Sequence, residues 1–184
     1  DSLYPTVDHM VQIHKETKFE LASGRSASWH IQEKSSKSTV FMSSSDSTSV
    51  ELVLTNTGDY IVHAVVDSYE THVFSATAKI IRYELRTLSD TDREAYFTAL
   101  HQFYVIPQTN GEALYGASYM SLSSVLRQHL YGAADKECDH WHDDAGIMTH
   151  HIAFTLEMEQ SLQSIDKTVT IPYWDYTQDA YKLD

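Results

Sequence analysis

The segment 142-HDDAGIMTHHIAFTLEMEQSL-162 decides how the second half of this chain folds. Five of its positions follow the three- and four-residue spacing of one face of an α-helix: Ile147, His151, Phe154, Met158 and Leu162. The pattern predicts a helix from about Ile147 to Ile165. His151 falls on its apolar face, where a polar group left without a partner costs about 1–3 kcal/mol. A hydrogen-bonding group or a metal ion is therefore expected beside His151.

Two other histidines are placed to join His151. His142 stands nine residues earlier in a polar loop over residues 133–146, and His129 lies on a preceding predicted helix over residues 119–131. A lone histidine on an apolar helix face is usually a hydrogen-bonded core residue, whereas three imidazoles from two helices and a loop can converge on one ion. Imidazole suits copper, zinc, iron and nickel, and the spacing alone does not choose among them.

The helical pattern begins near residue 89. Ser89 followed by Asp92 has the spacing of a helix-capping pair, so a helix is expected from about Asp90 to Tyr104. Pro107 ends this helix, because proline lacks the backbone N–H that a helix interior needs. The dipeptide Asn110-Gly111 then indicates a loop.

The helix over residues 119–131 is expected to end at Gly132, since glycine commonly follows the last helical turn. Its inward-facing side chains are expected to be Leu122, Leu126, His129 and Leu130. After the helix at His151, the segment 171-IPYWDYT-177 indicates extended chain. Its aromatic residues are expected to pack in the core, with Asp175 anchoring backbone or a ligand histidine.

The first part of the chain alternates apolar and polar residues, which is the period of β-strands. Strands are expected at residues 48–56, 60–68 and within 71–85, and weaker ones at 18–22, 28–33 and 39–43. The period changes near residue 83. We therefore expect an α+β chain in two parts, an antiparallel β-sandwich-like region over residues 1–82 and a helical region over residues 83–184.

The bulk composition narrows the classes of partner. A formal net charge of −13 over 184 residues repels phosphate backbones, so nucleic acid is not an expected partner. No apolar run approaches the roughly 20 residues that span a bilayer. Cys138 is the single cysteine, which excludes an intrachain disulfide. The chain begins at Asp1 rather than Met, which fits removal of a signal peptide or a longer precursor segment, or a fragment.

The histidine segment resembles the first copper-binding motif of tyrosinases, the type 3 copper proteins. That motif has a histidine, eight residues, a second histidine at the start of a helix, and a glutamate eight positions later. His142, His151 and Glu159 match it without a gap. The segment 171-IPYWD-175 is similar to the family's apolar PYWDW continuation, with Tyr176 in place of the last tryptophan. The resemblance covers about half of the chain.

The resemblance implies a copper site held by His129, His142 and His151, because the family's first ligand lies on an earlier helix at a variable distance. His101, on the helix before, is the alternative first ligand. The fold implied is the helical first half of a tyrosinase-type copper bundle, preceded here by an immunoglobulin-like (Ig-like) β region. In the family, two coppers bind O2 and oxidise phenols or catechols to quinones.

The sequence departs from the family pattern at two places near the motif. His150 stands where a packing tryptophan is expected, and Ile152 where an arginine is expected, so His150 is a candidate neighbour of the site. Some family members join a cysteine by a thioether to the ligand histidine two residues later. Cys138 has that spacing only to His140, so a thioether requires that His140 be a ligand or that the loop be rearranged.

The family's second copper needs three further histidines after the PYWD segment. The remaining histidines precede it at other spacings: His9, His14, His30, His63 and His72. The resemblance thus implies oxidation of a phenolic small molecule with O2 if a second copper-binding half, C-terminal or from another subunit, completes the centre. The alternatives are haemocyanin-like O2 binding, or a structural or assembly protein with a degenerate or incomplete tyrosinase fold. A secreted or extracellular-surface location is expected.

Overall fold

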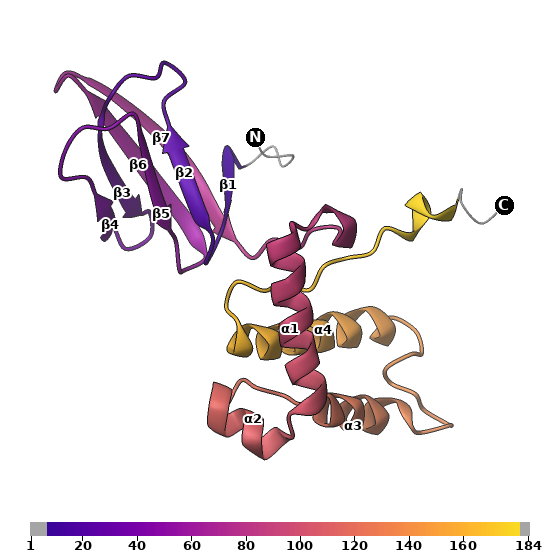
Figure 1. Cartoon of the computed structure of the whole chain (residues 1–184). Helices are drawn as coiled ribbons and strands as arrows, with labels where there is room; N and C mark the ends of the chain where they lie inside the picture. Colours follow the sequence, from indigo (N-terminus) through magenta and orange to yellow (C-terminus); the bar gives the residue numbers. More distant parts are fainter. Residues whose placement is uncertain (1–6, 181–184) are drawn as a thin grey trace. The chain divides into compact units, whose positions relative to one another are not determined.

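The computed structural model describes residues 7–180 and divides the chain into two compact units, the first ending at Ile81 and the second beginning at Arg82 (Figure 1). The first unit is built mostly from β-strands and the second from helices. This two-part α+β organisation is the one that the change of sequence period near residue 83 predicts. Within residues 7–180, no helix combines the length and the apolar character needed to cross a bilayer.

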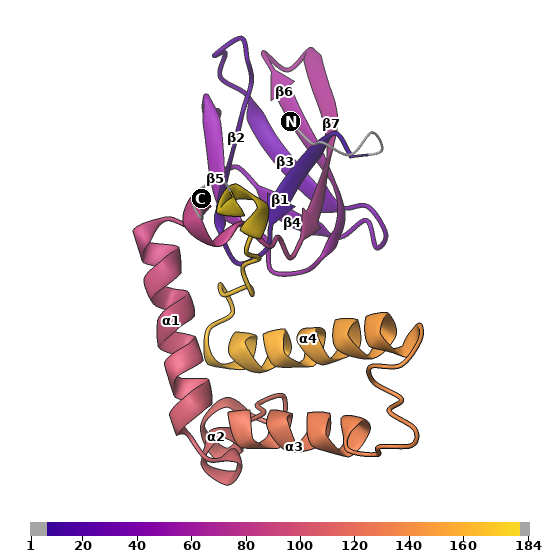
Figure 2. The same cartoon turned by 90° about the vertical axis from the view of Figure 1, so that its right-hand side faces the viewer.

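Strands of the first unit form two sheets, which Figure 2 shows from a second direction. The larger sheet has the strand order β1-β7-β6-β3-β4, and the smaller one pairs β2 with β5. All neighbours are antiparallel except β1 and β7, which are parallel. The bounds of the strands are β1 His9–Gln12, β2 Glu16–Glu20, β3 Ser28–Glu33, β4 Thr39–Met42, β5 Ser49–Val53, β6 Gly58–Val66 and β7 Glu70–Lys79.

The inward faces of the two sheets supply the core of the first unit. Alternate residues of β6 are buried, as a half-buried strand requires: Tyr60, Val62, Ala64 and Val66. On the neighbouring β3, Trp29 and Ile31 are buried, and the indole N–H of Trp29 donates to the carbonyl of Ser47 at 3.0 Å. The intervening residues His30 and His63 therefore lie on the outer face of the five-stranded sheet.

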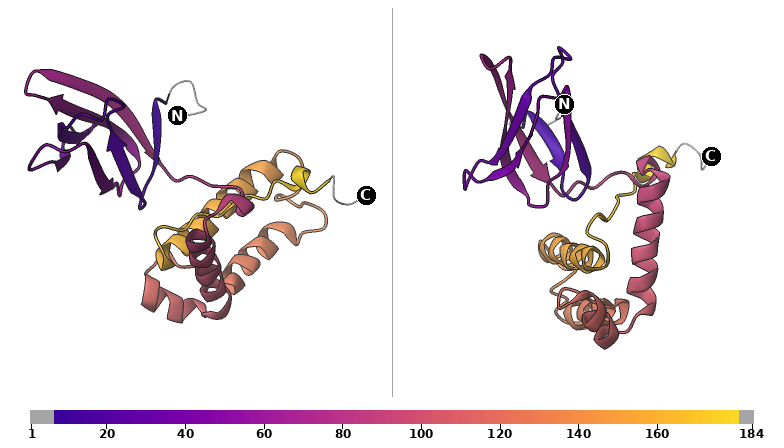
Figure 3. Two further views of the ribbon diagram at one scale, coloured as in Figure 1. Left: turned by 45° about the horizontal axis from the view of Figure 1, so that its top comes forward. Right: turned by 60° about the vertical axis from the view of Figure 1, so that its left-hand side comes forward.

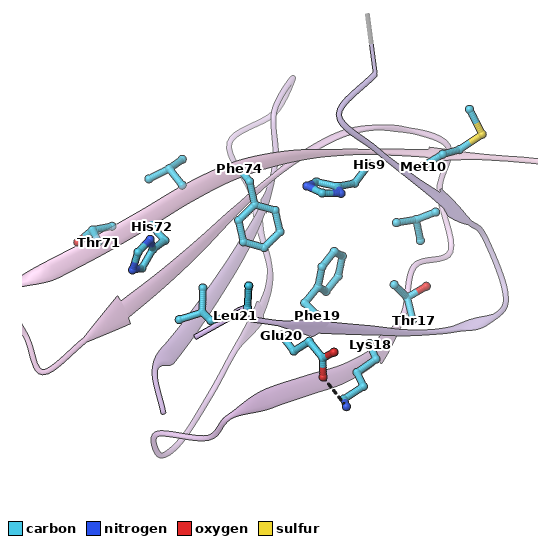
Figure 4. A pocket seen from close by; sticks show the side chains of 13 residues that line it. His9, Met10, Thr17, Lys18, Phe19, Glu20, Leu21, Thr71, His72 and Phe74 are labelled. Carbon is cyan, nitrogen blue, oxygen red and sulfur yellow. Dashed lines mark ion pairs between the residues drawn. The ribbon is translucent and has the colours of Figure 1, made fainter. Parts of the chain in front are cut away.

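An open groove of about 680 Å³ lies between β2 and the β1–β7 edge (Figure 4). Phe19 and Phe74 meet inside it with ring centres 5.9 Å apart, and His9 packs edge-on against Phe74. Two charged side chains of β2, Lys18 and Glu20, pair with each other at 2.6 Å. The groove is therefore a gap between the sheets that is lined by both aromatic and charged side chains.

The sequence patterns miss one strand of this unit. The strand expected within residues 71–85 is present as β7, which ends at Lys79, whereas β1 was not predicted. β1 has four residues, of which only Val11 is buried, so it shows too little alternation to be recognised. It is held by parallel pairing with the end of β7, where His9 lies opposite Ala76.

The helical unit places α1 steeply across α3 and α4, as Figures 2 and 3 show. Its helices are α1 Asp90–Val105, α2 Gln108–Tyr115, α3 Leu122–Ala133 and α4 Gly146–Ile165, with short 3-10 turns η1 Leu85–Thr87 and η2 Tyr176–Gln178. The cap predicted for α1 is confirmed, since the Ser89 hydroxyl accepts the Asp92 N–H at 3.1 Å. The buried apolar core consists of Ala99, Phe103, Val125, Leu162 and Val169.

Two glycine predictions in this unit are wrong. Gly111 lies inside α2 rather than in a loop, because Pro107 is the N-cap of a new helix and the Tyr119 ring occupies the space where a Cβ would stand. Gly132 lies inside α3, which continues for one more residue. The indole of Trp141 packs against Gly132 and leaves no room for a side chain there.

Two groups of residues expected in the core are exposed instead. On α3, Val125 is buried, whereas Leu126 and Leu130 are 54% and 62% exposed. In the PYWD segment, Tyr173 and Trp174 are more than half exposed. This segment is held by its backbone, since Tyr173 exchanges hydrogen bonds with the main chain of residues 83–85. Its aromatic side chains are therefore left on the surface of the unit.

Asp175 anchors backbone, which is one of the two roles expected for it. Its carboxylate accepts the Thr177 N–H at 3.2 Å and the side-chain amide of Gln178 at 2.8 Å. Hydrogen bonds from the side chains of Thr177 and Gln178 hold the pKa of Asp175 below its usual range. The backbone N–H of Asp175 in turn donates to the buried carboxylate of Glu84 at 3.3 Å. These bonds fix the turn η2.

A buried carboxylate fastens α4 to both flanking segments. Glu159, 3% exposed, accepts two hydrogen bonds from the Arg82 guanidinium at 2.8 and 2.9 Å, and a third from the Ile171 N–H at 3.0 Å. The side-chain hydrogen bond to Glu159 raises the pKa of Arg82, so the guanidinium stays charged. The glutamate of the tyrosinase-like motif therefore has a structural role in this chain.

Replacing Glu159 by glutamine should destabilise the helical unit. Glu159→Gln keeps the side-chain shape but leaves Arg82 without its counter-charge, so we expect the free energy of unfolding to fall by about 2 kcal/mol. The value is modest because Arg82 is 37% exposed. Urea denaturation followed by the helical circular dichroism signal measures it. Glu94→Gln, at an exposed position of α1, is the matched control, and equal losses in both variants would contradict this role.

Candidate metal centre

Three imidazoles converge between α3 and α4. His129 comes from α3, His151 from α4 and His142 from the connecting loop, and one ligand nitrogen from each lies within 4.8 Å of the others. The ring centres are 5.1 Å apart for His129 and His142, 5.2 Å for His142 and His151, and 5.7 Å for His129 and His151. Among residues 7–180, no other three histidine, cysteine or acidic side chains gather in this way.

These three residues are the ones that the sequence predicts as metal ligands. The antiparallel course of α3 and α4, visible in Figure 2, brings together positions that are far apart along the chain. His129 and His151 are half-buried and His142 is exposed. The Phe154 ring, one turn after His151, packs 5.9 Å from His129 and closes the inner side of the group.

Hydrogen bonds orient two of the rings. The Nδ1 of His142 lies 2.6 Å from a carboxylate oxygen of Asp139, and the Nδ1 of His151 lies 2.9 Å from the carbonyl of Ile147. In the neutral form of each ring, donation through Nδ1–H leaves the lone pair on Nε2, which is the nitrogen free to bind a metal. Two of the three rings are therefore oriented so that Nε2 can face a metal.

Asp139 also organises the loop that carries His142. Its other oxygen accepts the N–H groups of Trp141 and His142 at 3.0 Å each. Partial burial opposes ionisation of this carboxyl, but the hydrogen bonds from the His142 side chain and from the two amides together hold its pKa below the usual range. The carboxylate thus stays charged and fixes both the loop backbone and the His142 ring.

Trp141 forms a wall of the site that the sequence patterns did not reveal. Its indole meets the rings of His129 and His151 edge-on, with ring centres 5.6 and 6.0 Å apart, and stacks on His150 at 5.4 Å. Gly132 permits this position, because the indole fills the space of a Cβ there. Two sequence signals could have indicated this role. Trp141 lies between two histidines, and Gly132 lies three residues after His129, one helical turn away.

The alternative histidines lie outside the group. The Nδ1–H of His150 donates to the carbonyl of Gly146, 2.9 Å away, and the His150 ring rests on Trp141. His101 is exposed on α1. His150 is therefore a neighbour that supports the tryptophan, and the structure does not bring His101 into the three-imidazole group.

Cys138 is an exposed free thiol beside a different histidine. Its sulfur lies 3.3 Å from the Nε2 of His140, which is also exposed and does not belong to the three-imidazole group. A thioether to a ligand would therefore require rearrangement of the loop, as the sequence spacing indicates.

The donor set fits an ion that prefers imidazole. Metal–imidazole bonds of about 2.0 Å hold two ligand nitrogens at most about 4 Å apart, so the observed spread within 4.8 Å needs only a small closure. Three neutral nitrogens without a carboxylate suit copper, zinc or nickel better than calcium or magnesium. The geometry of the site thus fits copper without selecting it over other imidazole-binding metals.

The fold and the site together define an α-helical unit in which three histidines converge as a candidate metal centre. The family model for the common central domain of tyrosinase matches residues 91–184. The chain belongs to the tyrosinase family, which confirms the resemblance of its histidine motif at that level. Family membership implies copper as the metal.

Two curated relatives match part of this chain. Over 38 residues it is 45% identical to grixazone synthase of Streptomyces griseus, covering 21% of this chain and 12% of that protein. Over 101 residues it is 30% identical to the putative tyrosinase-like protein tyr-3 of Caenorhabditis elegans, covering 55% of this chain and 12% of that protein. The matched part is therefore about an eighth of the length of either relative.

Filling the space beside Gly132 should weaken metal binding. In Gly132→Ala the new methyl group would stand on the Trp141 indole, so that ring must leave His129 and His151. We expect copper affinity to fall roughly 10- to 100-fold, as for other losses of support around ligands. Competition with a chromophoric chelator measures it. Leu126→Ala, at an exposed position of the same helix, should bind copper normally; unchanged affinity in Gly132→Ala would contradict this role for Trp141.

Proposed function

We propose that this chain provides the first copper-holding half of a tyrosinase-type centre that oxidises phenols or catechols with O2 once a second half completes it. The observation that carries the proposal is the convergence of His129, His142 and His151 in a chain of the tyrosinase family. Copper, when bound, would supply the redox chemistry with O2. The protein's own residues would hold and orient the ion.

The proposed roles follow from the contacts around each ring. The proposed ligands are His129, His142 and His151. Each would bind the ion through Nε2 or through the ring nitrogen that faces the other two rings. Asp139 and the carbonyl of Ile147 hold two of the rings in the tautomer that leaves Nε2 unprotonated. Trp141 and Phe154 restrict water on the inner side.

An exposed apolar surface beside the centre supports the need for a second half. Leu126 and Leu130 form an exposed stripe on α3, and α4 carries another with four-residue spacing: Met148, Ile152 and Leu156. Leu130 follows His129 by one position, and Ile152 follows His151 by one position. One residue turns a helix by about 100°, so on two antiparallel helices whose ligands face each other, both of these side chains point to the same side of the helix pair. Further helices that carry the second ligand set would cover this surface.

We infer that the first unit is an Ig-like sandwich, and two features support this. Trp29 is buried on the inner face of the larger sheet, and the Tyr60 hydroxyl, near the start of β6, donates to the carbonyl of Asn56 at 2.8 Å. A buried tryptophan of this kind is typical of Ig-like folds, and so is a tyrosine whose hydroxyl donates to a backbone carbonyl a few residues upstream, which is called a tyrosine corner. A secreted or cell-surface location is proposed on the same ground.

Replacing one proposed ligand should remove one bound copper. His151→Ala leaves two imidazoles, and we expect the chain to lose one copper equivalent, with affinity at that site reduced by roughly tenfold or more. Elemental analysis after equilibrium dialysis counts the metal. His101→Ala, which alters an exposed histidine of α1, is the control. Copper content unchanged in His151→Ala would show that the ligand assignment is wrong.

Catalysis should depend on completion of the centre. We expect the intact gene product to convert catechol to quinone and to lose this activity in His142→Ala, followed by quinone absorbance and O2 consumption. Reversible O2 binding without quinone would instead favour the haemocyanin-like carrier. A copper-free protein without either property would favour the structural or assembly role and contradict the oxidase.

A further inference from the structure

A row of side chains crosses the outer face of the five-stranded sheet, away from its core. On β3, Trp29 and Ile31 are buried, so His30 between them points outward. The residue opposite His30 on β6 is His63, and the residue opposite it on β4 is Met42. Directly opposite residues of antiparallel strands point to the same face. Met42, His30 and His63 are therefore consecutive neighbours across three strands.

We propose that His30, His63 and Met42 form a second metal site, which takes Cu(I). Two imidazoles and a thioether make a neutral, soft ligand set, and thioether and imidazole are ligands that Cu(I) accepts. Hard cations such as calcium or magnesium need oxygen ligands, which this row does not supply. The site belongs to the first unit and shares no residue with the centre at His129.

The separation of the two imidazoles suits one shared ion. With a metal–nitrogen bond of about 2.0 Å, each ring centre lies about 3 Å from the ion, so two rings on one ion are about 5–6 Å apart. The ring centres of His30 and His63 are 5.7 Å apart. The same separation relates His129 and His151 in the candidate copper centre.

The hydrogen bonds leave one nitrogen of His30 for a metal. Its Nε2 lies 2.9 Å from the hydroxyl of Thr39 and 3.2 Å from the amide nitrogen of Gln32. If the Nε2–H of His30 donates to the Thr39 hydroxyl, the lone pair of the ring lies on Nδ1. A turn of the Gln32 amide by about 180° would then place its oxygen, rather than its nitrogen, beside this N–H. Thr39 would then orient His30 as an outer partner of the metal.

The other two ligands can adjust to the ion. The rings of His30 and His63 are stacked at 25°, so coordination requires the His63 ring to turn. Within the part of the chain that the structure describes, neither nitrogen of His63 has a hydrogen-bond partner to lose. Met42 is 66% exposed, and its unbranched thioether can swing toward the pair.

The test uses a double variant, His129→Ala with His151→Ala, in the full chain that also carries Cys138→Ser, so that neither the three-imidazole group nor the exposed thiol beside His140 competes for Cu(I). Cu(I) is titrated without oxygen against bicinchoninate. We expect one equivalent to bind, and affinity to fall by roughly tenfold or more on adding either His30→Ala or His63→Ala, since loss of a ligand exceeds the loss of an outer partner. Circular dichroism checks that these outward-facing substitutions leave the sheet intact.

Matched variants separate this site from general histidine or methionine effects. Met42→Leu should weaken binding of Cu(I) but change binding of Zn(II) little, because the thioether favours the softer ion. His72→Ala on the neighbouring β7 and Met148→Leu on α4 should leave Cu(I) binding unchanged. Because the His129 centre is already removed, the result is independent of the proposed oxidase function.

A second readout follows the ligands directly in the same double variant. Nuclear magnetic resonance of the ring nitrogens should show shifts for His30 and His63 on addition of one equivalent of Cu(I), with His72 unaffected. Absence of Cu(I) binding in the double variant, or binding that survives His63→Ala unchanged, would overturn the proposal.

Discussion

The helical unit depends on the buried carboxylate of Glu159. It lies about two turns after His151 on the same helix, and its bonds to Arg82 and to the backbone of Ile171 join three separated segments. A buried charge is tolerated only when it is paired and fully hydrogen-bonded, so the three segments must meet around it. This requirement fixes α4, and α4 in turn fixes the position of His151.

The three-imidazole group is built by a loop as well as by the helices. The helices supply His129 and His151, but His142 reaches them only because Asp139 organises the loop backbone and the ring. Trp141 packs on Gly132 and contacts the rings of both helical histidines. Binding of copper by this group is consistent with the family, while the proposed oxidation of a substrate depends on a partner that covers the exposed leucines beside it.

Local sequence rules predicted much of this arrangement. The period of α4, the Ser89 cap and the spacing of His142 and His151 were sufficient to place those elements, because each depends on neighbouring residues. The roles of Gly132 and Trp141 were missed, because a glycine can end a helix or accommodate a ring, and only the tertiary contact decides. Leu130 was expected in the core for a related reason. The spacing of an apolar residue indicates a face that another element would bury, but it does not identify which element packs on that face.

Anomalous X-ray diffraction at the copper edge tests whether one copper ion is shared by the three imidazoles. In crystals of the copper-loaded chain, we expect an anomalous peak about 2 Å from one nitrogen each of His129, His142 and His151. A copper ion bound instead by His140 or His150, or the absence of a peak among the three rings at full loading, would contradict this shared binding.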